Sequence, residues 1–299
     1  MKYLLYPGCS AEGSALEYKV STVKVLEALG AEIEELVDWT CCGASAASVQ
    51  SDLLGVTLPA RNLALAEQAA DDGATRAPLD MIAVCSACYT NFRRTSRALD
   101  QDPSLLKTVN EALEVEGLAL RNTVTTRHLM DVLAVDFTPE EIAQRVEQPL
   151  TGLTVAPYYG CQTVRPYSPY DDNEKPTSMV AVIEALGATV HRHNRGAACC
   201  GTSLMMTKPK VGYHMVGEVL KACSPADCVA AVCPMCHMNL DSYQGKASQV
   251  VGQELDIPIL FLPQLMGLAF GLSADELLLK RHVVPAESVL ERIAQAATT

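Results

Sequence analysis

The stretch AVCSACYTN at residues 83–91 returns as AVCPMCHMN at residues 231–239, and this repetition indicates how the chain is organised. Three shorter stretches repeat around it in the same order. They are TCCGAS at 40–45 and ACCGTS at 198–203, LEALGA at 26–31 and IEALGA at 183–188, and YPGC at 6–9 and YYGC at 158–161. Ordered copies lying about half the chain apart indicate a duplicated structural unit.

Each half alternates between strand and helix patterns. Short apolar runs predict strands at residues 3–6, 31–37 and 81–84, and again at 153–158, 188–193 and 228–232. Helical spacing predicts helices over 20–29, 59–70, 179–186 and 211–221. Because strands that alternate with helices form parallel βαβ units, we expect an α/β fold of two duplicated Rossmann-like parallel-sheet domains. An internal pseudo-twofold axis would relate the two domains.

The expected domains are residues 1–148 and 149–299, divided where Pro149 and Gly152 follow a polar helix at 139–147. Extra, less regular helical stretches at 104–135 and 263–292 trail the two halves, and they share the similar segments HLM at 128–130 and QLM at 264–266.

Composition excludes several classes of protein. The net charge of −12 opposes general binding to nucleic acid or to anionic membranes, and a single Trp offers little base stacking. The apolar run at 257–272 contains two prolines and a glutamine, so it indicates core rather than a transmembrane segment. Because no secretory signal opens the sequence, we expect a cytoplasmic protein whose cysteines are metal or redox ligands rather than disulfides.

Ten of the twelve cysteines fall into two matching sets. The first set is Cys9, Cys41, Cys42, Cys85 and Cys88, and the second is Cys161, Cys199, Cys200, Cys233 and Cys236. Each motif follows a predicted strand, and the carboxyl ends of parallel strands meet at one edge of a sheet, so each set can gather into one site. Cys223 and Cys228 lie outside both sets, and we expect them to be spectators.

The number of thiols in each set limits what it can hold. Structural zinc and an ordinary cubane 4Fe–4S cluster are each complete with four thiolates, which leaves the fifth cysteine without a place. A vicinal pair such as Cys41 and Cys42 suits a larger or more open cluster. Zinc and inert buried thiols stay open as competing interpretations.

The duplicated Cys, Cys-Cys-Gly and Cys-x-x-Cys motifs resemble those of the CCG-domain proteins, above all the B subunit of heterodisulfide reductase, over residues 9–243. The resemblance implies two noncubane 4Fe–4S clusters, one per half, each ligated by the five cysteines of its set. It also implies that both clusters face a shared cavity in which a disulfide is cleaved. The chain looks closer to bacterial sulfur-metabolism homologues, whose sulfur carrier is a protein-bound lipoyl group.

From this resemblance we expect the catalytic subunit of a heterodisulfide reductase-like complex, an iron–sulfur oxidoreductase that cleaves or forms a disulfide or handles carrier-bound sulfur such as lipoate. The implied partners are a C-type subunit with cubane 4Fe–4S clusters, an A-type flavoprotein and, as substrate, a disulfide, a thiol or a lipoyl carrier protein. The chain itself has no dinucleotide-binding motif and no cubane run through which electrons could enter. The alternative is an electron-relay iron–sulfur subunit of a succinate, lactate or glycolate-type dehydrogenase.

Three further side chains are candidate substrate contacts. Arg165 can clamp a carboxylate, and Lys208 can offset the negative charge of a cluster. His237, next to Cys236, can act as a ligand or as a proton donor. His237 corresponds to Tyr89 in the first half, which argues against a metal-ligand role common to both halves. A surface position is the competing interpretation for Arg165.

Two pairs of residues next to the cysteines should support the clusters. We expect Gly43 and Gly201 to donate backbone N–H groups to the anionic site. Asn91 and Asn239, three residues after each Cys-x-x-Cys motif, are interpreted as helix caps, with a hydrogen bond to the cluster as the alternative.

Overall fold

The computed structural model describes residues 1–44, 46–71 and 80–297. The first half contains β1 (Lys2–Tyr6), α1 (Gly8–Glu12), α2 (Leu16–Ala28), β2 (Glu32–Glu35), α3 (Ala47–Gln50), α4 (Asp52–Asp71), β3 (Asp80–Ala83), α5 (Ser86–Gln101), α6 (Pro103–Leu113), the 3-10 helix η1 (Glu114–Glu116), β4 (Thr125–His128), α7 (Leu129–Val135) and α8 (Pro139–Ala143). The second half contains β5 (Thr154–Tyr158), α9 (Ser178–Ala185), β6 (Thr189–Val190), η2 (Thr202–Leu204), α10 (Pro209–Cys223), β7 (Cys228–Ala231), α11 (Pro234–Ser242), α12 (Gln244–Val251), β8 (Ile259–Phe261), α13 (Leu262–Ala269), η3 (Leu279–Arg281) and α14 (Glu287–Ala297).

The strands form two sheets of four, and every pairing in them is parallel. The strand order is β2-β1-β3-β4 in the first sheet and β6-β5-β7-β8 in the second, so the same topology occurs twice. In both sheets the order reverses direction between the two central strands. The predicted α/β fold of two similar parallel-sheet domains is therefore confirmed.

The fourth strand of each sheet differs from the sequence-based prediction. β4 lies inside the stretch predicted as irregular helix at 104–135, and β8 precedes the second such stretch. Both are short edge strands, and periodicity alone does not separate a short buried strand from a piece of buried helix.

Strand register also corrects the match between HLM and QLM. His128 pairs with Ala83 and Phe261 pairs with Ala231, so His128 corresponds to Phe261 and the match is three residues out of register.

Two helix boundaries also differ. α4 begins at Asp52, seven residues before the predicted start, and Pro59 lies inside it. A proline in the first turn of a helix and one further along look alike in a single sequence. The helix predicted over 139–147 ends at Ala143.

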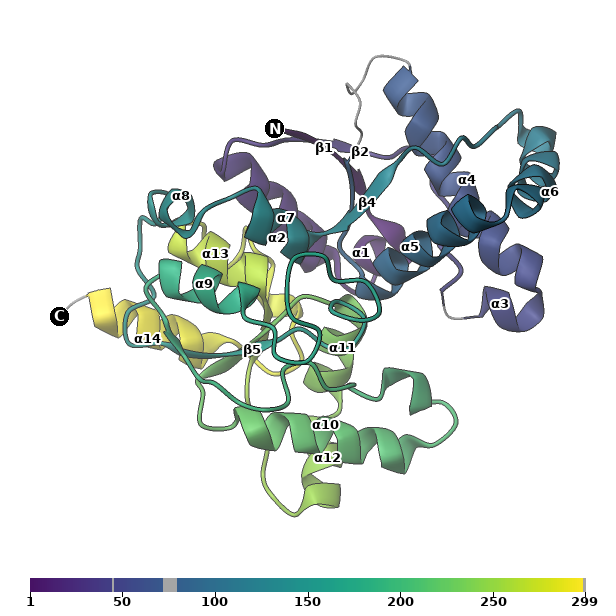
Figure 1. Ribbon diagram of the computed structural model, residues 1–299. Coiled ribbons are helices and arrows are strands. Elements are labelled where there is room, and N and C mark those ends of the chain that lie inside the picture. Colours follow the sequence, from purple (N-terminus) through teal and green to yellow (C-terminus); the bar gives the residue numbers. More distant parts are fainter. Residues whose placement is uncertain (45, 72–79, 298–299) are drawn as a thin grey trace.

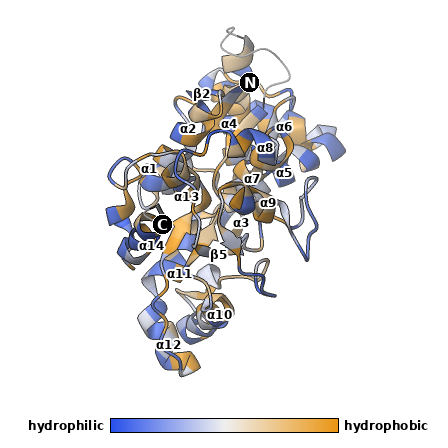
Figure 2. Cartoon of the chain, turned by 90° about the vertical axis from the view of Figure 1, so that its left-hand side faces the viewer, coloured by the Kyte–Doolittle hydropathy of each residue, from blue (hydrophilic) through white to orange (hydrophobic). Residues whose placement is uncertain are grey.

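Side chains of the strands alternate between two kinds of core. In β1, Tyr3 and Leu5 enter a core shared by both halves, whereas Leu4 and Tyr6 enter a core whose fully buried residues all belong to the first half. The second sheet likewise has one face on the shared core and one on a core of its own. In Figure 2 hydrophobic residues gather in the middle of the molecule, while the outer helices α12 and α14 carry much of the hydrophilic colouring. The shared core holds the two sheets together.

Helices in the shared core pack reciprocally. α2 of the first half contacts α13 of the second, and α9 of the second half contacts α7 of the first (Figure 1). α2 and α9 each follow the first strand of their sheet, and α7 and α13 each follow the fourth. The same contact thus occurs twice with the halves exchanged, as the expected pseudo-twofold relation requires.

Candidate metal centres

The motif cysteines lie beyond the carboxyl ends of the strands. Cys9 follows β1 and Cys85 follows β3, the two strands between which the strand order reverses, and Cys161 and Cys233 repeat this after β5 and β7. This switch point is where open α/β sheets bind their ligands. Cys85 and Cys233 are also the N-cap residues of α5 and α11, where the helix dipole favours a thiolate.

The first set forms a connected row of thiols. Cys42 Sγ lies 3.1 Å from Cys88 Sγ, and Cys88 in turn interacts with Cys85. Hydrogen bonds from Cys41 and Cys88 lower the pKa of Cys42 to about 4. Cys9 completes the group, because its charge acts on Cys41. All five cysteines of the set are therefore neighbours.

The second set repeats this order. Cys199 forms hydrogen bonds with Cys161 and Cys200, and these bonds lower the pKa of Cys199. Cys236 interacts with Cys200 and with Cys233. The second half thus contains the same row of thiols as the first.

The two rows meet at Cys85 and Cys233, whose side chains interact across the boundary between the halves, so that the pKa of Cys233 is lowered and that of Cys85 is raised. Both residues are buried, whereas Cys9, Cys41 and Cys199, toward the outer ends of the rows, are exposed. The ten cysteines therefore make one continuous thiol row with a buried middle, which reaches the surface at Cys9 and Cys41 in the first half and at Cys199 in the second.

Two side chains hold the first Cys-Cys-Gly turn, residues 40–43, which we call the first CCG turn. The Tyr6 hydroxyl donates to the carbonyl oxygen of Thr40 at 2.8 Å, and the amide Nδ2 of Asn91 donates to the carbonyl oxygen of Cys42 at 2.6 Å. The carbonyls on either side of Cys41 are therefore both fixed. Asn91 lies within α5 rather than at its end, so its interpretation as a helix cap is wrong.

Equivalent residues hold the second CCG turn, residues 198–201. The Tyr158 hydroxyl donates to the carbonyl oxygen of Ala198 at 2.8 Å, and Asn239 Nδ2 donates to that of Cys200 at 2.7 Å. Asn239 is likewise inside its helix, α11. The tyrosines and their role in the turns were not foreseen from the sequence, although YPGC and YYGC both place a tyrosine three residues before the first cysteine of their set.

Backbone amides of the two glycines point to sulfur, as predicted. Gly43 N lies 3.5 Å from Cys41 Sγ, and Gly201 N lies 3.4 Å from Cys199 Sγ. Such N–H groups stabilise negative charge on a metal-bound thiolate. Each CCG turn thus supplies a hydrogen-bond donor to its first vicinal cysteine.

The spacing of the thiols does not suit a single zinc ion. Four thiolates around one zinc lie about 3.8 Å apart, as a tetrahedron with Zn–S bonds of about 2.3 Å requires. Among the described residues, one group of three His, Cys, Asp or Glu side chains has ligand atoms that all lie within 4.8 Å of one another. It consists of His237, Asp241 and His282. No three described thiols converge in this way. Each set instead offers five thiols spread along a row, which fits a cluster of several metal ions better than one ion.

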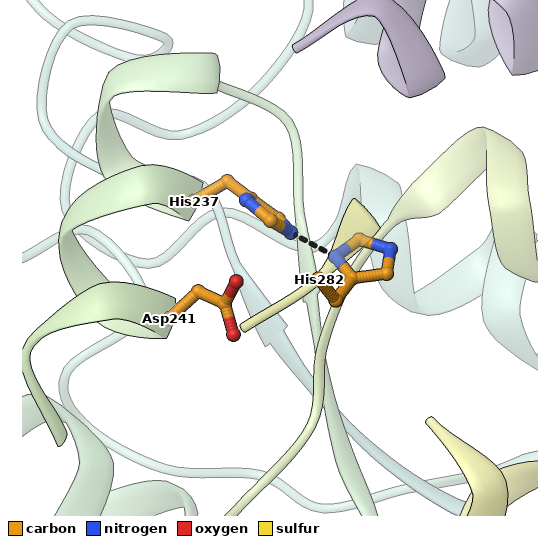
Figure 3. A group of neighbouring side chains, drawn as sticks. All are labelled: His237, Asp241 and His282. Carbon is orange, nitrogen blue, oxygen red and sulfur yellow. Dashed lines mark hydrogen bonds between the residues drawn. The ribbon is translucent and has the colours of Figure 1, made fainter. Parts of the chain in front are cut away.

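The His237, Asp241 and His282 trio has the composition of a metal site, but hydrogen bonds already occupy it. Figure 3 shows the two imidazole rings meeting edge to edge, with His237 Nε2 2.9 Å from His282 Nδ1. His237 Nε2 also lies 2.8 Å from the carbonyl oxygen of Ile259, so it carries a proton and donates. Both carboxylate oxygens of Asp241 accept backbone N–H bonds from residues 283 and 284. The trio is a buried hydrogen-bond network.

This network places His237 differently from its expected role as a substrate contact. The ring is buried, stacks on Phe261 at a centroid distance of 4.1 Å and uses Nε2 within the network. Sequence reasoning missed Asp241 and His282. The i, i+4 spacing of His237 and Asp241 on one helix was a usable signal for the first, whereas His282 comes from a distant segment that only the fold brings near.

Arg165 reaches the second set, although its guanidinium is engaged by the chain itself. Its Nη1 lies 2.8 Å from Glu174 Oε1, and its Nη2 donates to the carbonyl oxygen of Ala197. Its backbone N donates to the carbonyl oxygen of Cys161 at 3.0 Å. Lys208, the remaining candidate, is exposed just before α10.

The two cysteines outside the sets lie elsewhere in the fold. Cys228 is the first residue of β7, at the opposite end of that strand from Cys233. Cys223 ends α10 and has His193 Nε2 3.7 Å from its sulfur. Burial raises the pKa of both thiols. Neither belongs to the thiol row.

Comparison with solved structures supports the fold. A crystal structure of a hypothetical protein from Helicobacter pylori superposes with a TM-score of 0.73 at 17% sequence identity, over 95% of this chain and 52% of that one. This chain thus spans about half the length of that protein. At this level of identity the likeness concerns the fold alone.

Several relatives align over nearly the whole chain. The 8-methylmenaquinol:fumarate reductase membrane anchor subunit of Wolinella succinogenes is 33% identical, over 95% of this chain and 98% of that protein. A protein of Archaeoglobus profundus, named as similar to the B subunit of heterodisulfide reductase, is 28% identical over 98% of both chains. The B subunit of the ferredoxin:CoB-CoM heterodisulfide reductase of Methanosarcina mazei is also 28% identical, over 98% of this chain and 97% of that protein. Among the described residues of the present chain, no helix has the length and hydrophobicity needed to cross a bilayer.

The cysteine-rich domain model named CCG matches the chain twice, at residues 3–93 and 155–241. The two matches contain the ten cysteines of the thiol row, five in each. Each match also spans the first three strands of its sheet and the CCG turn between them. The chain therefore belongs to the CCG cysteine-rich domain family and carries two copies of that domain.

Proposed function

We propose that the chain is the catalytic iron–sulfur subunit of a heterodisulfide reductase-like complex and that it cleaves or forms a disulfide. Each of the proposed domains, 1–148 and 149–299, holds one noncubane 4Fe–4S cluster through its five cysteines. The observation that carries the proposal is the thiol row, in which two equivalent sets of five meet at Cys85 and Cys233.

The composition of each set supports a cluster of this type. Five thiolates exceed the four that a cubane cluster or a zinc ion binds, and the vicinal pair of each CCG turn can reach neighbouring irons. The amides of Gly43 and Gly201 offset part of the negative charge that the extra thiolate brings. The relatives named after the B subunit of heterodisulfide reductase give independent support for this class of protein.

Two adjacent centres suit a substrate with two sulfur ends. Reduction of a disulfide consumes two electrons and two protons and yields two thiols. Each bound cluster would supply one-electron redox chemistry and an iron that can take a sulfur ligand. The protein contributes the interaction between Cys85 and Cys233, which brings the two centres close enough to exchange electrons. It also leaves Cys9, Cys41 and Cys199 exposed, so the outer part of each centre is open to a thiol, a disulfide or a lipoyl group.

Electrons must reach the centres from other subunits. The chain contains no dinucleotide-binding motif and no cubane cysteine run. The partners that we propose are a C-type subunit with cubane 4Fe–4S clusters and an A-type flavoprotein. Lys208, exposed at the N-terminus of α10, stays a candidate contact for an anionic substrate.

A second candidate function is an electron relay within a dehydrogenase or fumarate reductase complex. It is favoured by the relative from Wolinella succinogenes, because that fumarate reductase subunit is 33% identical, compared with 28% for the two heterodisulfide reductase relatives. A thiol row that reaches the surface in both halves is also suited to pass electrons from one partner to another. In this function no substrate sulfur binds the centres.

Metal and sulfide analysis together with low-temperature paramagnetic resonance tests both candidates. Protein purified without oxygen should be brown and contain about eight irons, if each set holds four. Addition of a thiol or disulfide should then change the resonance spectrum, because a sulfur of the substrate binds at iron. A fully loaded protein whose spectrum ignores every thiol and disulfide would favour the relay, and a colourless, zinc-loaded protein would contradict both.

A further inference from the structure

We propose that a cavity between α5, β4 and Tyr167 binds a small organic anion with two negative charges, a phosphate ester or a dicarboxylate, through Arg93 and Arg97. The cavity has a volume of about 300 Å³. It lies at the boundary between the halves, because Tyr167 belongs to the second half and the other lining residues belong to the first. The inference goes beyond the proposed function and does not depend on the clusters.

The cavity is separate from the thiol row. It is lined by Thr125 and Thr126 at the start of β4, and Thr125 pairs with Asp80, the first residue of β3. The motif cysteines follow the carboxyl ends of the strands, so the cavity lies at the opposite end of the first sheet. Along α5, Arg93 is eight residues beyond Cys85, or about 12 Å at a rise of 1.5 Å per residue. A molecule bound in the cavity would therefore not be a ligand of the first centre.

The charged side chains that line the cavity have a net positive charge. Arg93 and Arg97 contribute two positive charges, and Asp100 contributes one negative charge. Among the described residues, neither arginine forms an ion pair, whereas Asp100 already accepts a hydrogen bond of 2.7 Å from Asn122. The cavity should therefore attract anions, although the chain as a whole has a net charge of −12.

The two arginines are placed to act together. They are four residues apart on α5, so their side chains are neighbours on the surface of the helix. The Arg93 guanidinium lies over the ring of Tyr167, 5.9 Å from its centroid, and this contact holds the cation at the cavity wall. A guanidinium donates paired N–H groups to the oxygens of a phosphate or a carboxylate. Two guanidinium groups can thus share one anion with two negative charges.

A buried hydroxyl without a partner is independent support for a polar ligand. Thr126 lines the cavity and is only 3% exposed, and its Oγ1 has no hydrogen-bond partner among the described residues. Leaving a buried hydroxyl without a hydrogen bond costs free energy. An anion held by the two arginines would accept a hydrogen bond from this hydroxyl and remove that cost.

In the second half, the chain itself fills the equivalent position. Because the Cys-x-x-Cys motifs begin α5 and α11 in the same way, Arg93 is equivalent to Asp241. Both carboxylate oxygens of Asp241 accept backbone N–H groups, from Val283 at 2.7 Å and from Val284 at 2.9 Å. In the first half a donor, Arg93, replaces this acceptor, and it faces a cavity rather than a chain segment. A donor in that position needs an acceptor from outside the chain.

The size and walls of the cavity indicate the kind of anion. Pockets for small organic ligands have volumes from about 300 Å³ upward, so this cavity suits a small organic anion. Val124 and the ring of Tyr167 supply apolar surface for the carbon atoms of the ligand. The ligand class is therefore a small molecule with one phosphate group or two carboxylate groups.

Isothermal titration calorimetry of the anaerobically purified full chain tests the inference. The probes are ribose 5-phosphate and succinate, at constant ionic strength, with neutral ribose as the control. One or both anions should bind, and ribose should not. The anion that binds more tightly assigns the charged group as a phosphate ester or as a dicarboxylate. R97Q should raise the Kd of that anion about tenfold or more, because it removes a hydrogen bond between charged groups.

Three further variants separate binding of the ligand from effects on structure. R94Q alters an exposed arginine of the same helix that does not line the cavity, so the Kd should stay the same. D100N removes the opposing carboxylate and should lower the Kd. T126V removes the unpartnered hydroxyl and keeps the shape of the side chain. It should raise the Kd about two- to tenfold without lowering the melting temperature of the free protein.

Three results would overturn the inference. The first is that neither anion binds, or that ribose binds as tightly as the anions. The second is a Kd that R97Q leaves unchanged. The third is a Kd that R94Q and R97Q raise equally, which would show attraction by the general charge of α5 and not by the cavity. Because the titration measures binding without use of the clusters, none of these results would contradict the proposed function.

Discussion

The side-chain amide of Asn91 donates a hydrogen bond of 2.6 Å to the backbone carbonyl of Cys42, and Asn239 makes the same bond of 2.7 Å to Cys200. Asn91 lies three residues after Cys88, so both face the same side of α5. The thiol of Cys88 and the amide of Asn91 therefore approach the vicinal pair together. One bond thus joins the Cys-x-x-Cys helix of each half to its CCG turn.

We expect N91A to disturb the first centre and to leave the second intact. The substitution leaves the Cys42 carbonyl buried without its partner, which costs about 1–3 kcal/mol of unfolding free energy, and it frees the turn to move relative to α5. Iron content and the resonance signal of the first centre should fall, while N239A should have the same effect on the second centre. Iron analysis, resonance spectra and denaturant unfolding measure these effects.

N110A provides a matched control for stability. Asn110 also bonds backbone through its amide, to Leu120, but far from the cysteines. Its loss should lower stability without loss of iron. Equal loss of iron from N91A and N110A would show that Asn91 acts only through general stability.

The cysteines themselves should divide into ligands and spectators. C42A should lose or alter only the first centre, because Cys42 contacts Cys41 and Cys88 of its own set. C223A should keep the full iron content, because Cys223 contacts His193 and no member of the thiol row. Iron and sulfide counts on the two purified variants decide this, and loss of both centres in C42A would show that the halves do not form separate sites.

The sequence made the duplicated sheets and the two cysteine sets predictable because both depend on local signals. Apolar runs ending at Pro-Gly or Cys-Cys-Gly mark the strands, and parallel strands necessarily bring their carboxyl ends together. β4 escaped prediction because its residues TTRH form no apolar run, and β8 because its residues ILF continue directly into the apolar helix α13. Their strand character depends on tertiary pairing, which a periodic pattern does not record.

Within the site, residues adjacent to the motifs were easier to foresee than those that reach them from elsewhere. The N–H donors of Gly43 and Gly201 follow from the motif itself. Asn62 accepts the backbone N–H of Thr40, 22 residues away in sequence, and His282 bonds Gln264 and His237, 18 and 45 residues away. These contacts exist only once the helices have packed. The contact of Cys85 with Cys233 likewise depends on how the two halves meet in the shared core.

Gly160 is a position where even one added carbon should disrupt a centre. Its φ of +71° lies in the left-handed region, and a Cβ there would lie 2.8 Å from Cys236 Sγ. G160A should therefore displace Cys236 and lower the iron content of the second centre. At the equivalent Gly8, where φ is +69°, a Cβ would lie 3.0 Å from Tyr6 Cε1 but 3.5 Å from Cys88 Sγ, so G8A should displace its cysteine less than G160A does. Iron analysis and the resonance signals of the two centres test this ranking of G160A and G8A. Equal losses of iron in both variants would refute it.

The buried pair of His237 and His282 should make stability depend on pH. Burial lowers the pKa of His282 to about 4, whereas an exposed histidine in the unfolded chain has a pKa of about 6.5. Between these values the unfolded chain binds a proton that the folded protein does not. Stability contributed by neutral His282 is therefore complete above pH of about 6.5 and falls as the pH drops toward 4, by up to about 3 kcal/mol.

H282Q removes this titration and one hydrogen bond to His237. At pH 7.5 the variant should be less stable than the unaltered protein by about 1–3 kcal/mol, because His237 loses a buried partner. At pH 5 the difference in stability between the variant and the unaltered protein should be smaller. Protonation of His282 on unfolding then destabilises the unaltered protein, whereas the variant has no such group. Thermal unfolding of both proteins at the two pH values measures the gap. A constant gap would contradict the assigned protonation, and a rise in melting temperature with Zn²⁺ in the unaltered protein alone would show that the network binds metal after all.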